Sequence, residues 1–270
     1  MTTLLLQLSD LHLFAEPEAV LRGVPTRDSL AEVLEAVRGT GLDFGRVVVT
    51  GDFTHDERRE TYQAAHGLLD EWIDRCHVLP GNHDDRVLLR EVFGDRAGGT
   101  DQGICFSESV GGWRLIGVDT HIPGEVPGRV EPAMLDWLAG ELDQHSSQPT
   151  ILFQHHPPIS VGSAWLDAIG LRDPGPFREL VIRSPQVRVV SCGHVHQESV
   201  GMLGQAAVLT VPSTGVQFTP LRDAPRVDTI PTGFRVFAFD EPAQGEDAGS
   251  VSWSSRVIRL PAVTFPALDE

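Results

Sequence analysis

Five short clusters of carboxylate, amide and imidazole side chains recur along the chain, and each follows an apolar run. Oxygen and imidazole nitrogen donors of this kind suit divalent iron, manganese or zinc, and they argue against a thiolate-rich structural metal site. A His-x-His pair also places both imidazoles on one face if the backbone is extended. The clusters are Asp10-Leu11-His12, Gly51-Asp52, Gly81-Asn82-His83-Asp84, His155-His156 and Gly193-His194-Val195-His196.

Each cluster taken alone has an ordinary structural explanation. The stretch LPGNHDD, residues 79–85, is rich in residues that supply turn dihedrals. A lone Asp-x-His or Gly-Asp after a strand is more often a turn or a helix cap than a ligand. All five clusters, however, stand where a predicted buried strand stops. Because the carboxyl ends of strands in an open α/β sheet form the functional crevice, we expect the clusters to converge in space.

Apolar runs typical of buried strands alternate with amphipathic helical patterns over the first two thirds of the chain. The first helix, for example, has Leu30, Val33, Leu34 and Val37 at i, i+3, i+4 and i+7. This alternation predicts an α/β architecture. We expect strands at 4–10, 46–52, 77–82, 113–120, 149–155 and 187–194, and helices around 30–37, 68–73, 134–142 and 175–184.

The last third of the chain has a different pattern. Strand-like runs at 206–214, 234–240 and 251–260 follow one another without a long helix, which predicts additional antiparallel strands. No Pro/Gly/Ser-rich linker interrupts the 270 residues, so a single domain spanning 1–270 is expected, with 241–270 as a C-terminal tail.

The charge balance is strongly acidic. The chain has 21 basic residues, all of them arginine, against 38 Asp and Glu, a net charge of −17. A field of that sign repels duplex nucleic acid and anionic membranes, so neither is an expected partner. Three cysteines without CxxC spacing fit a reducing compartment, and the N-terminal MTTLLLQLSD lacks the basic region of a signal peptide. These features predict a soluble, cytoplasmic protein.

The motifs DLH, GDF, GNHD, QHHPP and GHVH together resemble the motif string of the calcineurin-like metallophosphoesterases. Further stretches, among them SAWLDAIGLRD, VPSTGVQFTP and DTIPTGFRVF, are similar to the bacterial class III 3′,5′-cyclic AMP phosphodiesterases. The similarity extends over roughly residues 4–240. It implies an α/β protein of the α+β type, a four-layer α-β-β-α sandwich with two mixed sheets and a site across the strand ends.

The resemblance also implies two divalent metal ions that share one carboxylate ligand. Iron or manganese is expected, with zinc as the alternative. Two such ions about 3.5–4 Å apart bind a phosphoryl group between them and make a bridging hydroxide available as the nucleophile. The implied ligands are Asp10, His12, Asp52 and His196 for one ion and Asp52, Asn82, His155 and His194 for the other.

The GNHD motif carries the residues with implied catalytic roles. His83 resembles the family's phosphate-contacting histidine, which can protonate the departing O3′ of the substrate. Asp84 either orients His83 or caps the following helix. Asn82 and His83 are both expected to reach the substrate.

Other aromatic and basic residues have weaker indications. Trp165, Arg172 and Phe218 lie in the stretches similar to the cyclic-nucleotide enzymes. An aromatic face there could stack on adenine and the guanidinium could contact phosphate, but core packing and surface pairing explain these residues equally well. Five histidines have no motif position and are expected in surface or core packing: His55, His66, His77, His121 and His145.

The function implied is hydrolysis of 3′,5′-cyclic AMP to 5′-AMP by a dinuclear metal-dependent phosphodiesterase. Metal motifs alone do not separate this substrate from 2′,3′-cyclic nucleotides or phosphomonoesters, because all of them offer the same phosphoryl oxygens. A non-catalytic scaffold with this fold is disfavoured, since all seven expected ligands are present. The expected partner is therefore a small cyclic nucleotide, and no sequence pattern specifies an oligomeric state.

Overall fold

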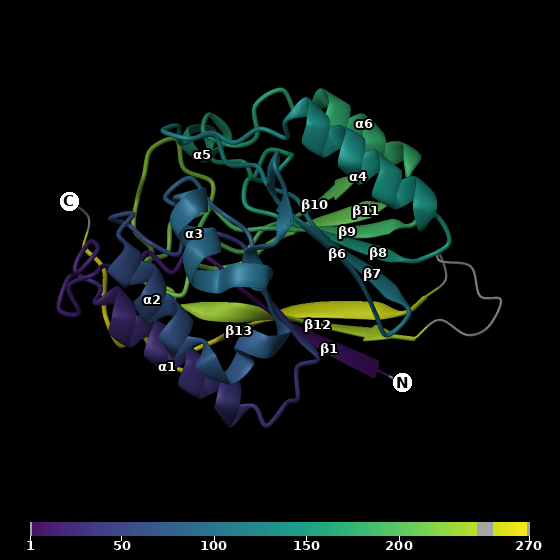
Figure 1. Cartoon of the computed structure of the whole chain (residues 1–270). Coiled ribbons are helices and arrows are strands. Elements are labelled where there is room, and N and C mark those ends of the chain that lie inside the picture. Colours follow the sequence, from purple (N-terminus) through teal and green to yellow (C-terminus); the bar gives the residue numbers. More distant parts are fainter. Residues whose placement is uncertain (1, 242–250, 269–270) are drawn as a thin grey trace.

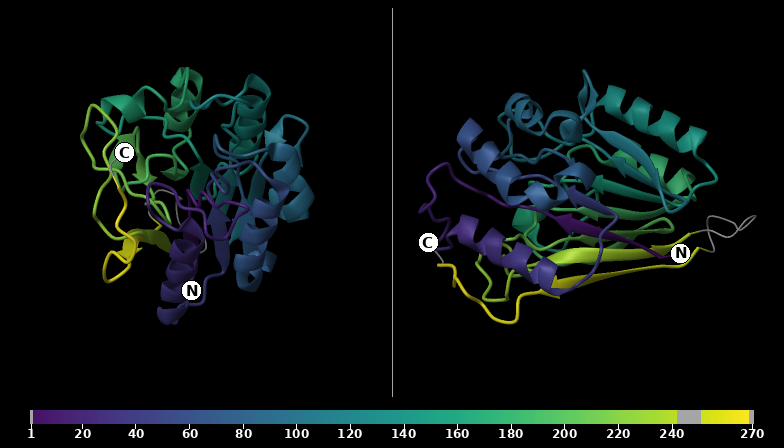
Figure 2. Two further views of the ribbon diagram at one scale, coloured as in Figure 1. Left: turned by 90° about the vertical axis from the view of Figure 1, so that its left-hand side faces the viewer. Right: turned by 60° about the horizontal axis from the view of Figure 1, so that its bottom comes forward.

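The computed structural model describes residues 2–241 and 251–268 (Figure 1). Two β-sheets lie face to face with helices on both outer sides, so the expected four-layer α-β-β-α sandwich is confirmed (Figures 1 and 2). α1 and α2 lie on the side of the first sheet, and α4 and α6 lie on the side of the second. The helices are α1 (Thr26–Gly39), α2 (Arg59–Leu68), α3 (Arg86–Phe93), α4 (Pro132–Gln144), α5 (Ala164–Asp167) and α6 (Gly175–Arg183), with 3-10 turns η1 (Asp70–Arg75) and η2 (Gly94–Ala97).

The first sheet has the strand order β13-β12-β1-β2-β3. β1, β2 and β3 are parallel, whereas β12 and β13 are antiparallel neighbours at the other edge. β13 lies in the C-terminal tail and pairs with β12, so described residues of the tail complete this sheet. The strands are β1 (Thr2–Leu8), β2 (Arg46–Val49), β3 (Cys76–Val78), β12 (Gly233–Asp240) and β13 (Trp253–Arg259).

The second sheet has the order β10-β11-β9-β8-β7-β6 and is also mixed. Its central strands β11, β9, β8 and β7 are parallel, and β10 and β6 are antiparallel edge strands. The strands are β6 (Phe106–Val110), β7 (Trp113–Gly117), β8 (Thr150–Gln154), β9 (Val187–Cys192), β10 (Val200–Leu203) and β11 (Ala206–Thr210), and a separate small ribbon consists of β4 (Gly99–Thr100) and β5 (Gly103–Ile104).

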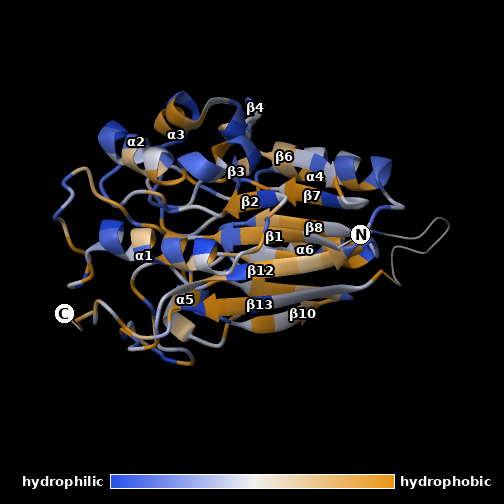
Figure 3. Cartoon of the chain, turned by 90° about the horizontal axis from the view of Figure 1, so that it is seen from below, coloured by the Kyte–Doolittle hydropathy of each residue, from blue (hydrophilic) through white to orange (hydrophobic). Residues whose placement is uncertain are grey.

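Continuous burial explains why the central strands read as unbroken apolar runs. All five residues of β8 are buried, and the second half of β1 is buried as well. Parallel strands covered on both faces have this pattern, while the helices keep polar outer sides. Figure 3 shows hydrophobic colours along most of the strands and a mixture of hydrophilic and hydrophobic colours along the helices.

Most of the expected elements are present, with two corrections. The helix expected around 68–73 lies earlier in the chain, because α2 ends at Leu68. Trp72 lies in the 3-10 turn η1 instead. The antiparallel strands expected after residue 206 are present in β12 and β13, but only in part in β11, which pairs antiparallel with β10 and parallel with β9. Among the described residues, no helix is long and apolar enough to cross a bilayer.

Candidate dinuclear metal centre

The five polar clusters lie just beyond the carboxyl ends of β1, β2, β3, β8 and β9, and the structure brings them together. The loops after β1 and β2 are joined by two backbone hydrogen bonds, Asp10 N–H to Gly51 O and His12 N–H to Asp52 O, both at 2.9 Å. The convergence expected from strand ends is therefore confirmed. It arises because parallel strands in each sheet end at the same edge, and the two edges face one another.

Four buried side chains form the first donor group. One ligand atom from each of Asp10, His12, Asp52 and His196 lies within 4.8 Å of the others. The Nε2 atoms of His12 and His196 are 2.9 Å apart, with Oδ2 of Asp52 3.4 Å from His12 Nε2 and Oδ1 of Asp10 3.4 Å from His196 Nε2. This is the set that the resemblance implied for one ion.

The second donor group shares Asp52 with the first. Nε2 of His155 is 3.4 Å from Oδ2 of Asp52 and 3.3 Å from Oδ1 of Asn82. Nδ1 of His194 is 3.0 Å from the same Asn82 oxygen. The four residues implied for the other ion thus also meet, and Asp52 Oδ2 faces both groups.

Backbone carbonyls orient three of the imidazoles. A carbonyl beside one ring nitrogen can accept its N–H, which leaves the other nitrogen with a free lone pair for a metal. In each case the second nitrogen faces the donor groups described above. The pairs are His155 Nδ1 with Thr50 O at 2.6 Å, His194 Nε2 with Ile169 O at 3.0 Å and His196 Nδ1 with Val216 O at 2.9 Å.

The backbone at the centre has left-handed φ angles at five of the expected ligands. Left-handed φ angles are uncommon outside glycine and collect at functional sites, where surrounding structure holds them. Glycine is needed beside these residues as well, because a Cβ on Gly81 would collide with the Asp52 carboxylate. The expected ligands with left-handed backbone are Asp10 (φ 56°), His12 (45°), Asp52 (54°), His194 (71°) and His196 (49°).

The electrostatics of the centre favour a positive charge between the carboxylates. Burial acts to lower the pKa of His155, but the neighbouring Asp52 carboxylate overcomes it and raises the pKa to about 9. Burial likewise acts to raise the pKa of Asp52, and His155 and His12 reverse this, so that it lies well below its ordinary value. A cation bound between the same carboxylates would be stabilised by the same field. Two buried carboxylates surrounded by oriented imidazoles and one amide oxygen therefore fit a pair of divalent ions.

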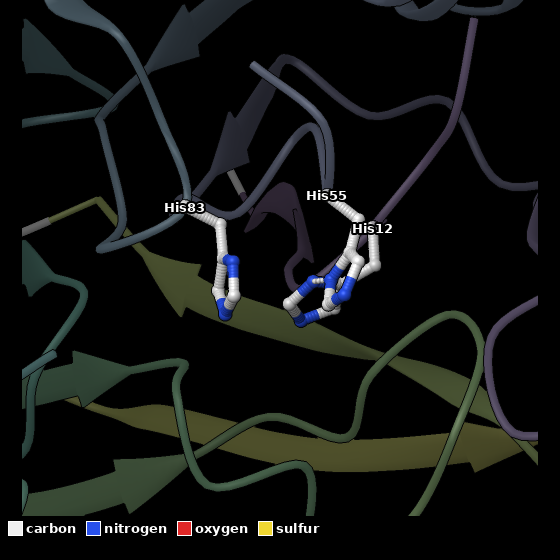
Figure 4. A group of neighbouring side chains, drawn as sticks. All are labelled: His12, His55 and His83. Atoms are coloured by element: carbon white, nitrogen blue, oxygen red, sulfur yellow. Dashed lines mark hydrogen bonds between the residues drawn. The ribbon is translucent and has the colours of Figure 1, made fainter.

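Three imidazoles from separate loops stand at the mouth of the centre (Figure 4). The ring of His83 is 5.0 Å from the ring of His12, edge to face, and stacks on the ring of His55 at 4.8 Å. Nδ1 of His55 is 3.4 Å from Nδ1 of His12. His55, for which surface or core packing was expected, therefore lies against two of the site histidines. In the sequence, His55 follows the GDF motif after one residue, Thr54, and this position was the available signal.

Asp84 has neither of the two contacts expected of it. The cap of α3 is Asp85, whose carboxylate accepts from the N–H groups of Val87 and Leu88. The Asp84 carboxylate instead accepts from Gly81 N–H at 2.8 Å, from Phe53 N–H at 3.1 Å and from the Tyr62 hydroxyl at 3.3 Å. Asp84 thus joins the loop after β3 to the loop after β2.

A pocket of about 290 Å³ opens beside the donor groups. One wall is aromatic: the rings of Trp165 and Phe218 meet edge to face at 5.0 Å, and Phe218 stacks on the expected ligand His196 at 4.8 Å. Arg172 does not line this pocket, because its guanidinium pairs with Glu125 at 2.6 Å on the surface. Its expected phosphate contact is therefore not supported. Arg22, which the sequence reasoning missed, lines the pocket instead.

The remaining histidines mostly have structural partners. His77 stacks on Phe106 and bonds to Glu108, which agrees with packing. His156 is buried next to His155, and both of its ring nitrogens have oxygen partners, Thr120 Oγ1 at 2.8 Å and Val126 O at 3.0 Å. With both nitrogens occupied, His156 supports the expected ligands rather than adding to them.

Comparisons with known proteins agree with this geometry. Residues 3–198 match the family model of the calcineurin-like phosphoesterases. The chain is 35% identical over 237 residues to the 3′,5′-cyclic adenosine monophosphate phosphodiesterase CpdA of Pseudomonas aeruginosa, with 87% of this chain and 84% of the relative covered. It is 32% identical to CpdA of Escherichia coli (strain K12), with 86% and 83% covered. A dimetal phosphatase from Danio rerio has a similar fold, with a TM-score of 0.63 at 16% identity over 93% of this chain and 98% of the other.

Proposed function

The chain belongs to the calcineurin-like phosphoesterases, and on that premise we propose that it is a dinuclear metal-dependent phosphodiesterase that hydrolyses 3′,5′-cyclic AMP to 5′-AMP. The observation that carries this proposal is the shared carboxylate: Asp52 Oδ2 lies 3.4 Å from an imidazole of each donor group. Relatives that are 35% and 32% identical over most of the chain are named for this substrate.

The seven side chains would hold the two ions in the two overlapping groups described above. When bound, a pair of divalent ions would supply Lewis acidity to the phosphoryl oxygens and lower the pKa of a bound water. Imidazole, carboxylate and amide donors suit iron or manganese, with zinc as the alternative. The role of this chain is to point the other ring nitrogen of each imidazole inward, through the carbonyl contacts of His155, His194 and His196.

His83 would donate the proton that the departing O3′ needs. Its side chain is half-buried and lines the pocket, next to the expected ligand Asn82. Its backbone N–H is bonded to Asp52 Oδ1 at 2.9 Å, and its ring lies against those of His12 and His55. Such a contribution from a positioned general acid is worth on the order of 10²–10⁴ in rate.

The adenine would lie against the aromatic wall of the pocket. Trp165 and Phe218 offer an apolar surface on which a base can stack. Nε1 of Trp165 is buried and has no hydrogen-bond partner among the described residues, so it is available as a donor to a ring nitrogen. The aromatic wall of this pocket supports a nucleotide, rather than a small phosphate ester, as the substrate.

The proposal includes a cytoplasmic location. All three cysteines, Cys76, Cys105 and Cys192, are free and buried. Free thiols are the rule in a reducing compartment, which supports this placement.

Product analysis on metal-depleted and metal-reconstituted protein tests the function. Iron-, manganese- or zinc-loaded protein should convert 3′,5′-cyclic AMP to 5′-AMP, and a chelator should abolish the conversion. A panel with 2′,3′-cyclic AMP and 5′-AMP separates the diester and monoester alternatives. Undiminished turnover in metal-free protein, or a faster reaction with the monoester, would refute the proposal.

A further inference from the structure

Three arginines line an open groove that adjoins the candidate active-site pocket. Arg22, Arg222 and Arg226 surround a space of about 690 Å³, and Arg22 also lines the pocket that contains the donor groups. One carboxylate, Asp223, is present in the groove. We call this feature the arginine groove, defined by Arg22, Arg222 and Arg226.

The charges of the arginine groove are unpaired in a protein with a large excess of acid. Among the described residues, none of the three guanidinium groups has a hydrogen-bond or ion-pair partner. Other arginines of this chain, such as Arg38, Arg46 and Arg59, do pair with glutamates. With a net charge of −17, carboxylates are abundant on the surface, so three arginines that line one groove without forming an ion pair to a described residue point to an anion that comes from outside.

The segments that carry the arginines are held together by a small apolar cluster. Val24, Val216 and Val227 are buried against one another, with Leu21 and Phe218 packed on them. Leu21 and Val24 exchange two backbone hydrogen bonds at 2.9 Å and so close the turn that presents Arg22. Phe218 belongs both to this cluster and to the aromatic wall. The same apolar cluster therefore packs against the arginine groove and the active-site pocket.

The second arginine segment is anchored at both ends. Thr219 N–H donates to Arg226 O at 2.8 Å, which closes the loop over residues 219–226. The N–H of Arg222 reaches Ser163 Oγ at 3.4 Å, beside α5 and Trp165. A guanidinium fork on an anchored backbone is suited to bidentate recognition of a phosphate.

We propose that the arginine groove binds a phosphate group of the bound nucleotide other than the one at the metal centre. The inference rests on the proposed function, because it takes the reacting diester to lie at the donor groups. A cyclic mononucleotide has a single phosphate and leaves the groove unused. The substrate class that uses both sites is a nucleotide with a second, terminal phosphate, such as a 5′-phosphorylated dinucleotide.

Calorimetric binding of two dinucleotides to the metal-loaded protein tests the proposal. The probes are adenylyl-adenosine with and without a 5′-terminal phosphate, each with a cleavage-resistant phosphorothioate linkage. We expect about tenfold tighter binding of the phosphorylated probe, an effect that weakens as salt is added. The double variant Arg222→Ala and Arg226→Ala should bind both probes equally. The control Arg183→Ala removes an exposed arginine of α6 and should keep the tenfold preference.

Three outcomes would overturn the assignment. The first is equal binding of both probes by the parent protein, and the second is a preference that survives the double variant. The third is that the unphosphorylated probe with millimolar inorganic phosphate binds as tightly as the phosphorylated one, because the groove would then hold a free phosphate. Turnover of bis(4-nitrophenyl) phosphate, measured separately, reports on the metal centre alone, so failure of the proposed function is distinguished from failure of the groove.

Discussion

The backbone N–H of His83 donates a hydrogen bond to Oδ1 of Asp52 at 2.9 Å, while Oδ2 of the same carboxylate faces His12 and His155 at 3.4 Å each. One side chain therefore links both donor groups to the residue proposed as the proton donor. Any change at Asp52 should affect metal binding and the position of His83 together.

Replacing Asp52 by Ala should remove the shared ligand, so we expect loss of both metals and a fall in cyclic AMP hydrolysis of more than about 100-fold. Metal analysis and steady-state kinetics measure the two effects, and circular dichroism reports on the fold. The control Asp74→Ala removes a carboxylate whose side chain is 99% exposed, and it should resemble the parent. Two tightly bound metals in Asp52→Ala would show that the bridge is wrongly assigned.

His83→Ala should keep both metals and slow the cleavage of cyclic AMP by about 10²-fold or more, because O3′ then leaves without a proton. A nitrophenyl diester has a leaving group that needs no proton and should lose much less. The ratio of kcat/KM values for the two substrates is the decisive measurement. Equal losses on both would instead indicate that His83 only binds phosphate.

Asn82→Asp should bind metal as well as or better than the parent, yet lose at least about tenfold in kcat/KM for cyclic AMP. The amide oxygen of Asn82 supplies a donor without a charge, next to His155 and His194. A third carboxylate would repel the anionic substrate by roughly 1–4 kcal/mol at ~4 Å. Metal titration measures the expected metal affinity, and steady-state kinetics measure the expected loss in kcat/KM. Parent-like turnover would refute the charge argument.

His55→Ala should reduce kcat by about tenfold with unchanged metal content. His55 lies between His12, 3.4 Å from its Nδ1, and His83, on which it stacks. Loss of an orienting partner of this kind typically costs 10–100-fold in activity or metal affinity. The control is His145→Ala, which removes a histidine just after the end of α4 whose partner is Glu141. A parent-like kcat in His55→Ala would show that the stacking of His55 on His83 has only a packing role.

Glu108 should contribute acid-sensitive stability away from the metal centre. It lies on β6 and accepts from Arg46 on β2 and, at 2.8 Å, from His77 on β3, so it joins the two sheets. Its bond to Arg46 lowers the pKa of Glu108 from 4.5 to about 2. A lowered folded-state pKa means that this stability is fully present above pH 4.5 and is lost as the pH falls towards 2.

Glu108→Gln should therefore unfold more easily at neutral pH by about 1 kcal/mol, the pair being partly exposed, and the difference should vanish near pH 2. Urea denaturation between pH 2 and pH 7 measures it. Asp43→Asn, which disrupts a pair with a 92% exposed carboxylate, should have no comparable effect. A pH-independent difference for Glu108→Gln would contradict the linkage.

The sequence by itself determined the strand and helix pattern and the convergence of the polar clusters at strand ends, whereas the two sheets and the ligand set were implied by the family resemblance. Strands such as β8 are buried on both faces and so read as continuous apolar runs, and the polar residue that follows each parallel strand must lie at the shared edge. Asp10 and Asp52, which follow the neighbouring parallel strands β1 and β2, could be assigned to one edge on this ground, before any distance was known.

Only the tertiary structure decided which residues outside the strand ends reach the site. Arg172 and Arg22 are both plausible phosphate ligands by residue type, yet Arg172 pairs with Glu125 and Arg22 enters the pocket. His55 and Asp84 likewise gained their contacts from neighbouring loops that meet at the end of the first sheet. The physical reason is that loop side chains take their direction from left-handed backbone angles and from partners distant in the chain, and neither is encoded in local periodicity.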